Sequence, residues 1–103
     1  MDEVFKALAD ASRRSLLDRL HAKNGQTLND LCDGLAMTRQ AVTKHLRVLE
    51  RVRILHGTRD GRQSLFTFDP QPVIEMKEYL ELVSKQWDIA LARLKAFVEG
   101  EQG

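Results

Sequence analysis

Residues 38–55, TRQAVTKHLRVLERVRIL, have the periodicity of an amphipathic helix. Val42, Leu46 and Leu49 are spaced by four and three residues, which places them on one side of such a helix. The opposite side carries Arg39, Gln40, Thr43, Lys44 and Arg47. A helix that lies in a DNA major groove needs an apolar face for anchoring and a polar face for bases and phosphates. An ordinary surface helix with a solvated basic face has the same pattern, so this segment alone leaves both interpretations open.

Two further helices are expected at the start of the chain. Asp10 can cap a helix over residues 11–23, which Asn24 and Gly25 would end because both tolerate the left-handed backbone conformation. A shorter helix is expected before it, over residues 3–9. The apolar side of this first helix consists of Val4, Phe5 and Leu8.

A helix-turn-helix is expected next. Thr27 and Asp30 have the spacing of a capping box, with Asp in place of the usual Glu, and this predicts a helix of about eight residues. A tight turn at residues 35–37 then leads to the recognition helix, residues 38–52, with Thr38 as its N-cap. The second helix of such a motif is the one that enters the major groove.

The apolar period changes from 3.6 to 2 after the recognition helix. This change predicts two strands, residues 54–59 and 62–69, joined by the favoured two-residue hairpin loop Asp60-Gly61. Arg59 and Arg62 flank the tip. A hairpin in this position is a wing, whose arginines can reach phosphate or the adjacent minor groove, although exposed arginine pairs elsewhere are usually only solvated.

A long helix is expected over residues 72–99, because Pro72 is favoured in a first helical turn. Its apolar residues alternate spacings of three and four over nearly four heptads, as in a coiled-coil seam. The seam consists of Val73, Met76, Leu80, Val83, Trp87, Ala90, Leu94 and Phe97. A chain of this size has little core to cover so long a stripe, so we expect a second copy to cover it. The alternative is that the helix folds back on its own domain.

The positive charge is concentrated in the central third of the chain. Residues 36–64 hold seven Lys and Arg against two acids, whereas residues 1–35 hold five against six and residues 65–103 hold four against seven. This distribution is typical of a polyanion-binding surface on a protein whose net charge is only +1.

Length and composition indicate one domain, residues 1–103, in a reducing compartment. The single cysteine, Cys32, excludes an internal disulfide. No apolar run approaches membrane-spanning length, and the N-terminus MDEVFKALAD has no signal pattern. We therefore expect a cytoplasmic protein without a membrane partner.

Three segments carry a family resemblance. They are FKALADASRRSLLDRL at residues 5–20, the segment 38–55 and TRDGRQSLFTFDPQPV at residues 58–73. Together they closely resemble the ArsR-type family of bacterial winged helix-turn-helix repressors, and within it the subgroup that lacks metal ligands, the autorepressors. The resemblance implies a mainly α fold with a two-stranded β-hairpin wing. It also implies transcriptional repression by a homodimer, built from the first and last helices, on a palindromic operator in double-stranded DNA.

The resemblance also implies site residues, carried over by position. It assigns groove contacts to the polar face found above from periodicity, and phosphate contacts to the wing. With the N-cap included, the predicted DNA-binding set is Thr38, Arg39, Gln40, Thr43, Lys44, Arg47, Arg59 and Arg62. The predicted dimer interface is Val4, Phe5, Leu8, Val73, Met76, Leu80, Val83, Trp87 and Leu94.

The sequence departs from the family pattern in three places. Ala11 and Ser12 stand where relatives commonly have proline and threonine, and Ala36 stands where glycine is frequent. Alanine tolerates a positive φ poorly, so we expect a slightly altered turn at Ala36. Metal-sensing relatives have paired cysteines on the third helix or Asp/His clusters on the last. Here Cys32 is alone and the last helix has no histidine.

No cofactor, metal site or enzyme is predicted. A regulatory metal needs three or four converging ligands, whereas His21, His45 and His56 lie far apart in sequence. No nucleophile motif or glycine-rich phosphate loop is present. Cys32 is interpreted as a small packing residue.

The sequence thus favours a dimeric, sequence-specific DNA-binding repressor that does not respond to metals. One alternative is a dimeric protein-interaction module on the same fold, and another is a thiol- or metal-sensing repressor that uses Cys32. The small-molecule effector is unknown, and the space around Trp87 and Tyr79 between protomers is the first place to look for one.

Overall fold

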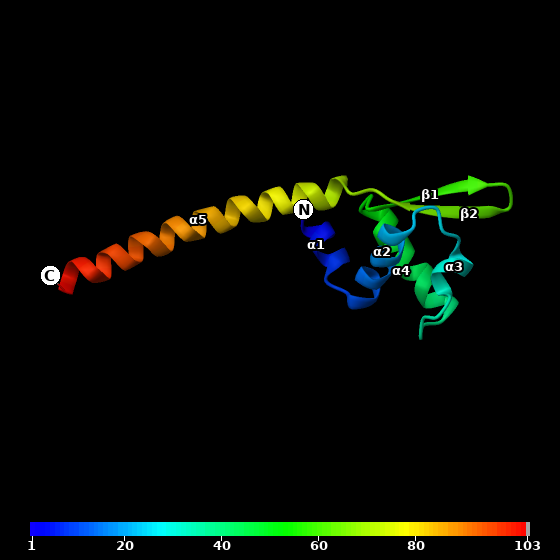
Figure 1. Ribbon diagram of the computed structural model, residues 1–103, viewed down its shortest axis with the longest axis horizontal. Coiled ribbons are helices and arrows are strands. Elements are labelled where there is room, and N and C mark those ends of the chain that lie inside the picture. The colour runs from blue at the N-terminus through cyan, green and yellow to red at the C-terminus, as the bar shows by residue number, and fades with distance from the viewer. Residues whose placement is uncertain (103) are drawn as a thin grey trace. The chain divides into compact units, whose positions relative to one another are not determined.

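The computed structural model describes residues 1–102, which form two compact units that divide after Val73. The first unit contains helices and one antiparallel hairpin, and the second consists of the long C-terminal helix (Figure 1). The elements in chain order are α1 (Asp2–Leu8), α2 (Ala11–Ala22), α3 (Leu28–Cys32), α4 (Arg39–Arg51), β1 (Leu55–Asp60), β2 (Gln63–Phe68) and α5 (Gln71–Gln102). The mainly α fold with a two-stranded wing is confirmed, whereas the organisation as a single domain stays a prediction.

Side-chain caps start α2, α3 and α4 at the predicted residues. Asp10 Oδ1 accepts a hydrogen bond from the Arg13 backbone N–H at 3.1 Å, and Thr38 Oγ1 accepts one from Ala41 at 3.1 Å. The capping box is also present, since Thr27 Oγ1 and the carboxylate of Asp30 each accept the other residue's backbone N–H. These caps satisfy amides that have no partner within their own helix.

The first helix of the helix-turn-helix is shorter than predicted. Helix α3 has five residues, not about eight, and the connection to α4 covers residues 33–38 instead of 35–37. Gly34 adopts φ 73, a left-handed conformation that ends the helical path. The Arg19 guanidinium donates to the carbonyl oxygen of Asp33 at 2.5 Å, which holds the turned chain in place. The positive φ in this connection falls on Gly34 and not on Ala36, and the altered turn expected at Ala36 stays a prediction.

The wing is shifted by one residue relative to the prediction. Asp60 pairs with Gln63 in the ladder, so the two-residue loop is Gly61-Arg62 and not Asp60-Gly61. Gly61 takes the left-handed conformation, with φ 62, and this leaves Asp60 free to extend its strand. As a consequence, Arg62 lies in the loop itself, while Arg59 lies opposite Ser64.

A short pairing with the segment before α3 widens the hairpin, and no local pattern in the sequence predicts it. Gln26 and Phe66 exchange backbone hydrogen bonds of 3.3 Å and 2.8 Å. The buried Gln26 side chain donates to the carbonyl oxygens of Arg19 and Lys23 at 2.7 Å and 2.6 Å. Gln26 therefore closes the end of α2 and fixes the hairpin beside it.

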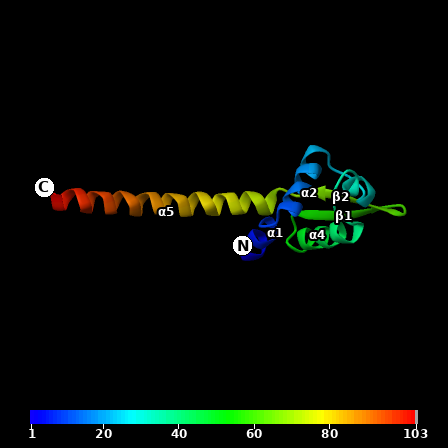
Figure 2. The same ribbon diagram turned by 90° about the horizontal axis from the view of Figure 1, so that it is seen from below.

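The core lies where α2, α3 and α4 meet the base of the hairpin. Helix α2 contacts β2 and helix α4 contacts β1, so this base lies against both helices (Figure 2). The apolar residues that the helical period of α4 places on one side, Val42, Leu46 and Leu49, are all buried. On α2 the buried residues are Leu16, Leu17 and Leu20. Ala7, Leu31, Ile54 and Leu55 complete the buried cluster.

Helix α5 is one continuous helix that begins one residue before the predicted Pro72 and ends three residues after Glu99 (Figure 1). Asp69 starts it, because its Oδ1 accepts the backbone N–H of Gln71 at 3.0 Å. Within the described residues, no helix combines the length and apolar character that crossing a membrane requires.

The predicted dimer residues differ in how much of each is exposed. Leu80, Trp87 and Leu94 are 47%, 64% and 58% exposed, and Phe97, on the same seam, is 63% exposed. Met76 and Val83 are half-buried. Three of the predicted residues pack partly against the core of their own chain instead, namely Val4, Leu8 and Val73. Phe5 is half-buried.

Candidate nucleic-acid interface

The outward side of α4 gathers most of the predicted DNA-binding residues on one surface. Five of them line a single open hollow of about 520 Å³: Arg39, Gln40, Thr43, Lys44 and Arg47. The opposite side of the same helix is buried in the core, since Val42 and Leu49 are 0% exposed and Leu46 is 2% exposed. The helix therefore cannot rotate to hide its polar face without exposing three core residues.

Two residues of this α4 face, Thr43 and Arg39, already donate hydrogen bonds within the protein. Thr43 donates its hydroxyl to the Arg39 carbonyl oxygen at 2.9 Å, within the helix. Its methyl group and oxygen lone pairs are what it can offer a DNA base. The Arg39 guanidinium donates from Nη1 to Oδ1 of Asn29. Asn29 lies ten residues earlier on α3 and has no counterpart in the predicted set, because only the tertiary fold brings it to Arg39.

The wing brings one of its two predicted arginines beside α4. A second hollow, of about 360 Å³, lies between α3, the start of α4 and the wing, and its polar lining includes Asn29, Arg39, Arg62, Gln63 and Ser64. Arg59 does not line this hollow. The two wing arginines, which flank the tip of the predicted hairpin, are therefore not equivalent.

The comparisons with known proteins agree with this geometry. A family model described as a helix-turn-helix domain matches residues 8–58. The chain is 38% identical over 78 residues to the uncharacterized HTH-type transcriptional regulator YuzN of Bacillus subtilis, covering 70% of this chain and 85% of that protein. It is 28% identical to the solved structure of an ArsR-like transcriptional regulator from Rhodococcus sp. RHA1, with a TM-score of 0.89, covering 96% of this chain and 90% of that one.

This chain belongs to the ArsR-type winged helix-turn-helix family of transcriptional regulators. A further relative is the transcriptional repressor SdpR of Bacillus subtilis, 32% identical over 63 residues, which cover 60% of this chain and 68% of that protein. Family membership confirms the resemblance seen in the sequence and the prediction that the protein is not an enzyme.

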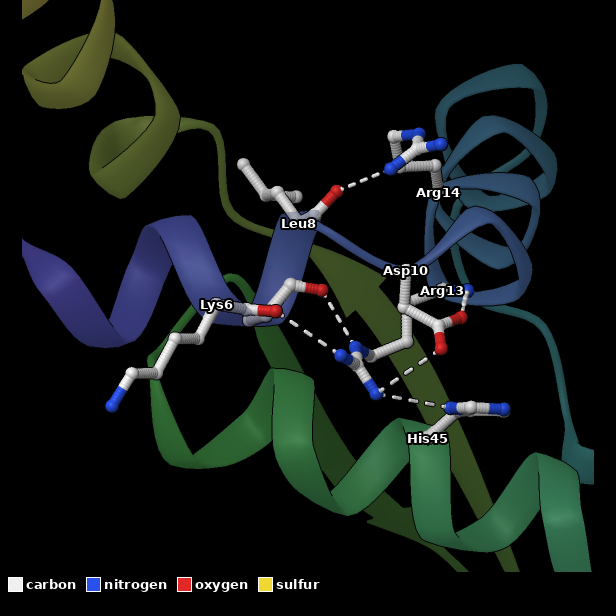
Figure 3. A network of polar contacts seen from close by, with 7 residues as sticks. Lys6, Leu8, Asp10, Arg13, Arg14 and His45 are labelled. Atoms are coloured by element: carbon white, nitrogen blue, oxygen red, sulfur yellow. Dashed lines mark hydrogen bonds and ion pairs between the residues drawn. The ribbon is translucent and has the colours of Figure 1, made fainter.

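In this ArsR-type regulator, His45 lies on α4 but outside the outward face. Figure 3 shows its ring beside the Arg13 side chain, with Arg13 Nη1 at 3.3 Å from His45 Nδ1. The same guanidinium donates to the carbonyl oxygens of Ala7 and Lys6 at the end of α1. The hydrogen bond that the Asp10 carboxylate accepts from the Arg13 backbone N–H is the main reason why the pKa of Asp10 lies below its ordinary value. Arg13 thus links α1, α2 and α4.

The remaining candidate metal ligands of the regulator are separated in space. Among the described residues, no three His, Cys, Asp or Glu side chains are grouped closely enough to hold a metal ion. His56 pairs with Asp69 at 3.0 Å, and His21 packs edge-on against Phe68. Cys32 is half-buried and packs against the core, in agreement with its interpretation as a packing residue.

Proposed function

We propose that the protein is a cytoplasmic transcriptional repressor that binds a palindromic operator as a homodimer, with the outward side of α4 in the DNA major groove. The observation that carries this proposal is the single polar face of α4, which lines one open hollow while the other face is locked in the core. A basic face on a rigidly anchored helix supports groove insertion, because the side chains are held at a fixed distance from the protein body.

The residues of this interface divide into two roles. Lys44, Arg47 and the wing arginines supply positive charge for phosphates, which fixes the position of the protein along the duplex. Gln40 and Thr43 lie on the same face nearer the start of α4, where they contact base edges, Gln40 through its amide and Thr43 through its methyl group and the lone pairs of its hydroxyl oxygen. Affinity then falls steeply with salt, since each neutralised phosphate releases counterions.

The exposed apolar seam of α5 supports the homodimer. Trp87 and Leu94, with exposed fractions of 64% and 58%, are spaced by one heptad, and Leu80 lies one heptad before Trp87. A row of large apolar side chains of this length is a surface that a partner normally covers. A two-fold pairing of α5 helices presents two α4 helices to successive major grooves, about 34–36 Å apart.

Repression without metal control is the regulatory part of the proposal. The relative SdpR is named a transcriptional repressor, which supports the direction of regulation. The separation of the histidines and the burial of Cys32 in packing contacts support a regulator that does not sense metals or thiol oxidation. Zinc or peroxide is therefore expected to leave operator binding unchanged.

The proposal is tested by selecting bound sequences from random duplexes and titrating the selected duplex with protein. We expect Lys44→Ala to weaken binding about tenfold and Arg59→Ala to weaken it less, because Lys44 lies on the helix inserted in the groove, whereas Arg59 lies on the wing outside both hollows. Lys85→Ala, on the exposed surface of α5, is the matched control and keeps the parent affinity. If the parent selects no duplex, or both interface variants bind as the parent does, the interface is wrong and a protein-interaction module becomes the better account.

A further inference from the structure

We infer that Arg39 and Arg62 together hold one backbone phosphate of the DNA, in the hollow between the start of α4 and the wing. This inference rests on the proposed function and goes beyond it, because it assigns one phosphodiester to two specific guanidinium groups. It also assigns Arg39 to a phosphate and not to a base edge.

The lining of this hollow has the chemistry of an anion site. Its two cations come from different elements, Arg39 from α4 and Arg62 from the hairpin loop. Among the described residues that line it, none is acidic, and the neutral polar groups of Asn29, Gln63 and Ser64 lie around the arginines. Two guanidinium groups that face the same space repel one another unless an anion lies between them.

Arg39 is held toward this space by Asn29. The bond from Arg39 Nη1 to Asn29 Oδ1 uses one of the five donor hydrogens of the guanidinium. Asn29 thereby orients the group in advance, so less side-chain entropy is lost when Arg39 binds a phosphate. In this account Asn29 is a positioning residue, which acts through Arg39.

The shifted hairpin register is what brings Arg62 to the hollow. Because Asp60 pairs with Gln63, Arg62 occupies the second position of the loop, directly after the left-handed Gly61. Arg59 lies on β1 opposite Ser64 and does not line the hollow. A planar guanidinium forms paired hydrogen bonds with phosphate oxygens, so two of them can grip the two free oxygens of one phosphodiester.

The experiment replaces single phosphates of the selected duplex by uncharged methylphosphonates, one position at a time. For the parent protein, we expect one position in each half-site where neutralisation weakens binding about tenfold. In Arg39→Ala and in Arg62→Ala, neutralisation at that same position weakens binding less than it does in the parent, and in the double variant it no longer weakens binding. Arg47→Ala, which lies outside this hollow, is the matched control and keeps the sensitivity of that position.

Salt titrations give an independent reading of the same site. The double variant lowers the slope of log affinity against log salt by about 0.9, because only one phosphate is lost, and each single variant lowers it by less, because one cation stays at that phosphate. A loss of about 1.8 in the double variant, or two arginines that map to different phosphates, overturns the inference. If inorganic phosphate competes with the duplex for the parent but not for Arg62→Ala, the hollow binds free phosphate as well.

Asn29→Ala tests the positioning role. When it is introduced into the parent protein, this substitution weakens DNA binding. When it is introduced into Arg39→Ala, it has no further effect if Asn29 acts only through Arg39. An equal loss in both backgrounds contradicts this role. Because the parent must first select a duplex, failure of the proposed function is seen as no selection at all, whereas failure of the inference alone leaves selection intact and changes only the phosphate map.

Discussion

Arg13 on α2 contacts His45 on α4 through their side chains, with 3.3 Å between Nη1 and Nδ1 (Figure 3). A guanidinium can only donate, so Nδ1 of His45 is the acceptor in this contact. The other donors of Arg13 bind the carbonyl oxygens of Ala7 and Lys6 at 2.6 Å and 3.1 Å. One side chain therefore closes the end of α1 and connects it to the recognition helix.

We predict that Arg13→Ala lowers the free energy of unfolding by about 2 kcal/mol, because it leaves helix-terminal carbonyls without a charged donor. Only 17% of the Arg13 side chain is exposed. Arg14→Ala is the matched control, since the exposed Arg14 makes a single bond to the Leu8 carbonyl oxygen at 2.6 Å. Urea unfolding measures both, and equal losses for the two variants contradict a special role for Arg13.

The two faces of α4 are expected to separate stability from DNA binding. Leu46→Ala removes a side chain that is 2% exposed and lowers the free energy of unfolding by about 3 kcal/mol. Lys44→Ala changes it by less than about 0.5 kcal/mol, while it weakens DNA binding. If Lys44→Ala lowers the free energy of unfolding more than Leu46→Ala does, the face of α4 that carries Lys44 is the buried one, and the assigned orientation is wrong.

The capping box of α3 is expected to make stability depend on pH in the acid range. A hydrogen bond from the backbone N–H of Thr27 is the largest cause that holds the pKa of Asp30 below its ordinary value of 3.8, and a hydrogen bond with the Thr27 hydroxyl is the second. A carboxylate whose pKa is lower in the folded state than in the unfolded state stabilises the fold fully above its unfolded pKa, about 3.8. This stabilisation is lost as the pH falls through the lower pKa of the folded state.

Asp30→Asn is therefore less stable than the parent near neutral pH, and the difference shrinks below about pH 3.8. Urea unfolding of both proteins at several values between about pH 7 and about pH 2.5 measures it. A difference that stays constant across this range shows that the charge of Asp30 contributes nothing.

The seam of α5 is expected to carry the dimer. Trp87→Glu places a charge in the centre of the seam and raises the dimer dissociation constant at least tenfold. Lys85→Glu is the control, because residue 85 lies about 200° around the helix from residue 87. Sedimentation equilibrium measures both variants, and an unchanged dimer in Trp87→Glu contradicts pairing through this seam.

Local patterns in the sequence were sufficient for most of the fold. The period of Val42, Leu46 and Leu49 identified the buried side of α4, and the caps at Asp10 and Thr38 identified where helices begin. These features depend on residues within about four positions of one another, which is the range over which helix periodicity and capping act.

The details that the sequence did not reveal depend on contacts between distant segments. Arg39 meets Asn29 and Gln26 pairs with Phe66 only after the chain has folded. The hairpin loop was misplaced by one residue, because a favoured Asp-Gly pair does not determine which of its residues stays in the ladder. That single shift separated Arg62 from Arg59, and no periodic pattern distinguishes them.

The insertion of two α4 helices into successive major grooves is tested most directly by hydroxyl-radical footprinting of the selected duplex. We predict two symmetric protected half-sites whose centres lie about 10–10.5 base pairs apart, with both protections weakened in Lys44→Ala at a concentration that just saturates the parent. A single unsymmetrical footprint, or one that Lys44→Ala leaves unchanged, would contradict it.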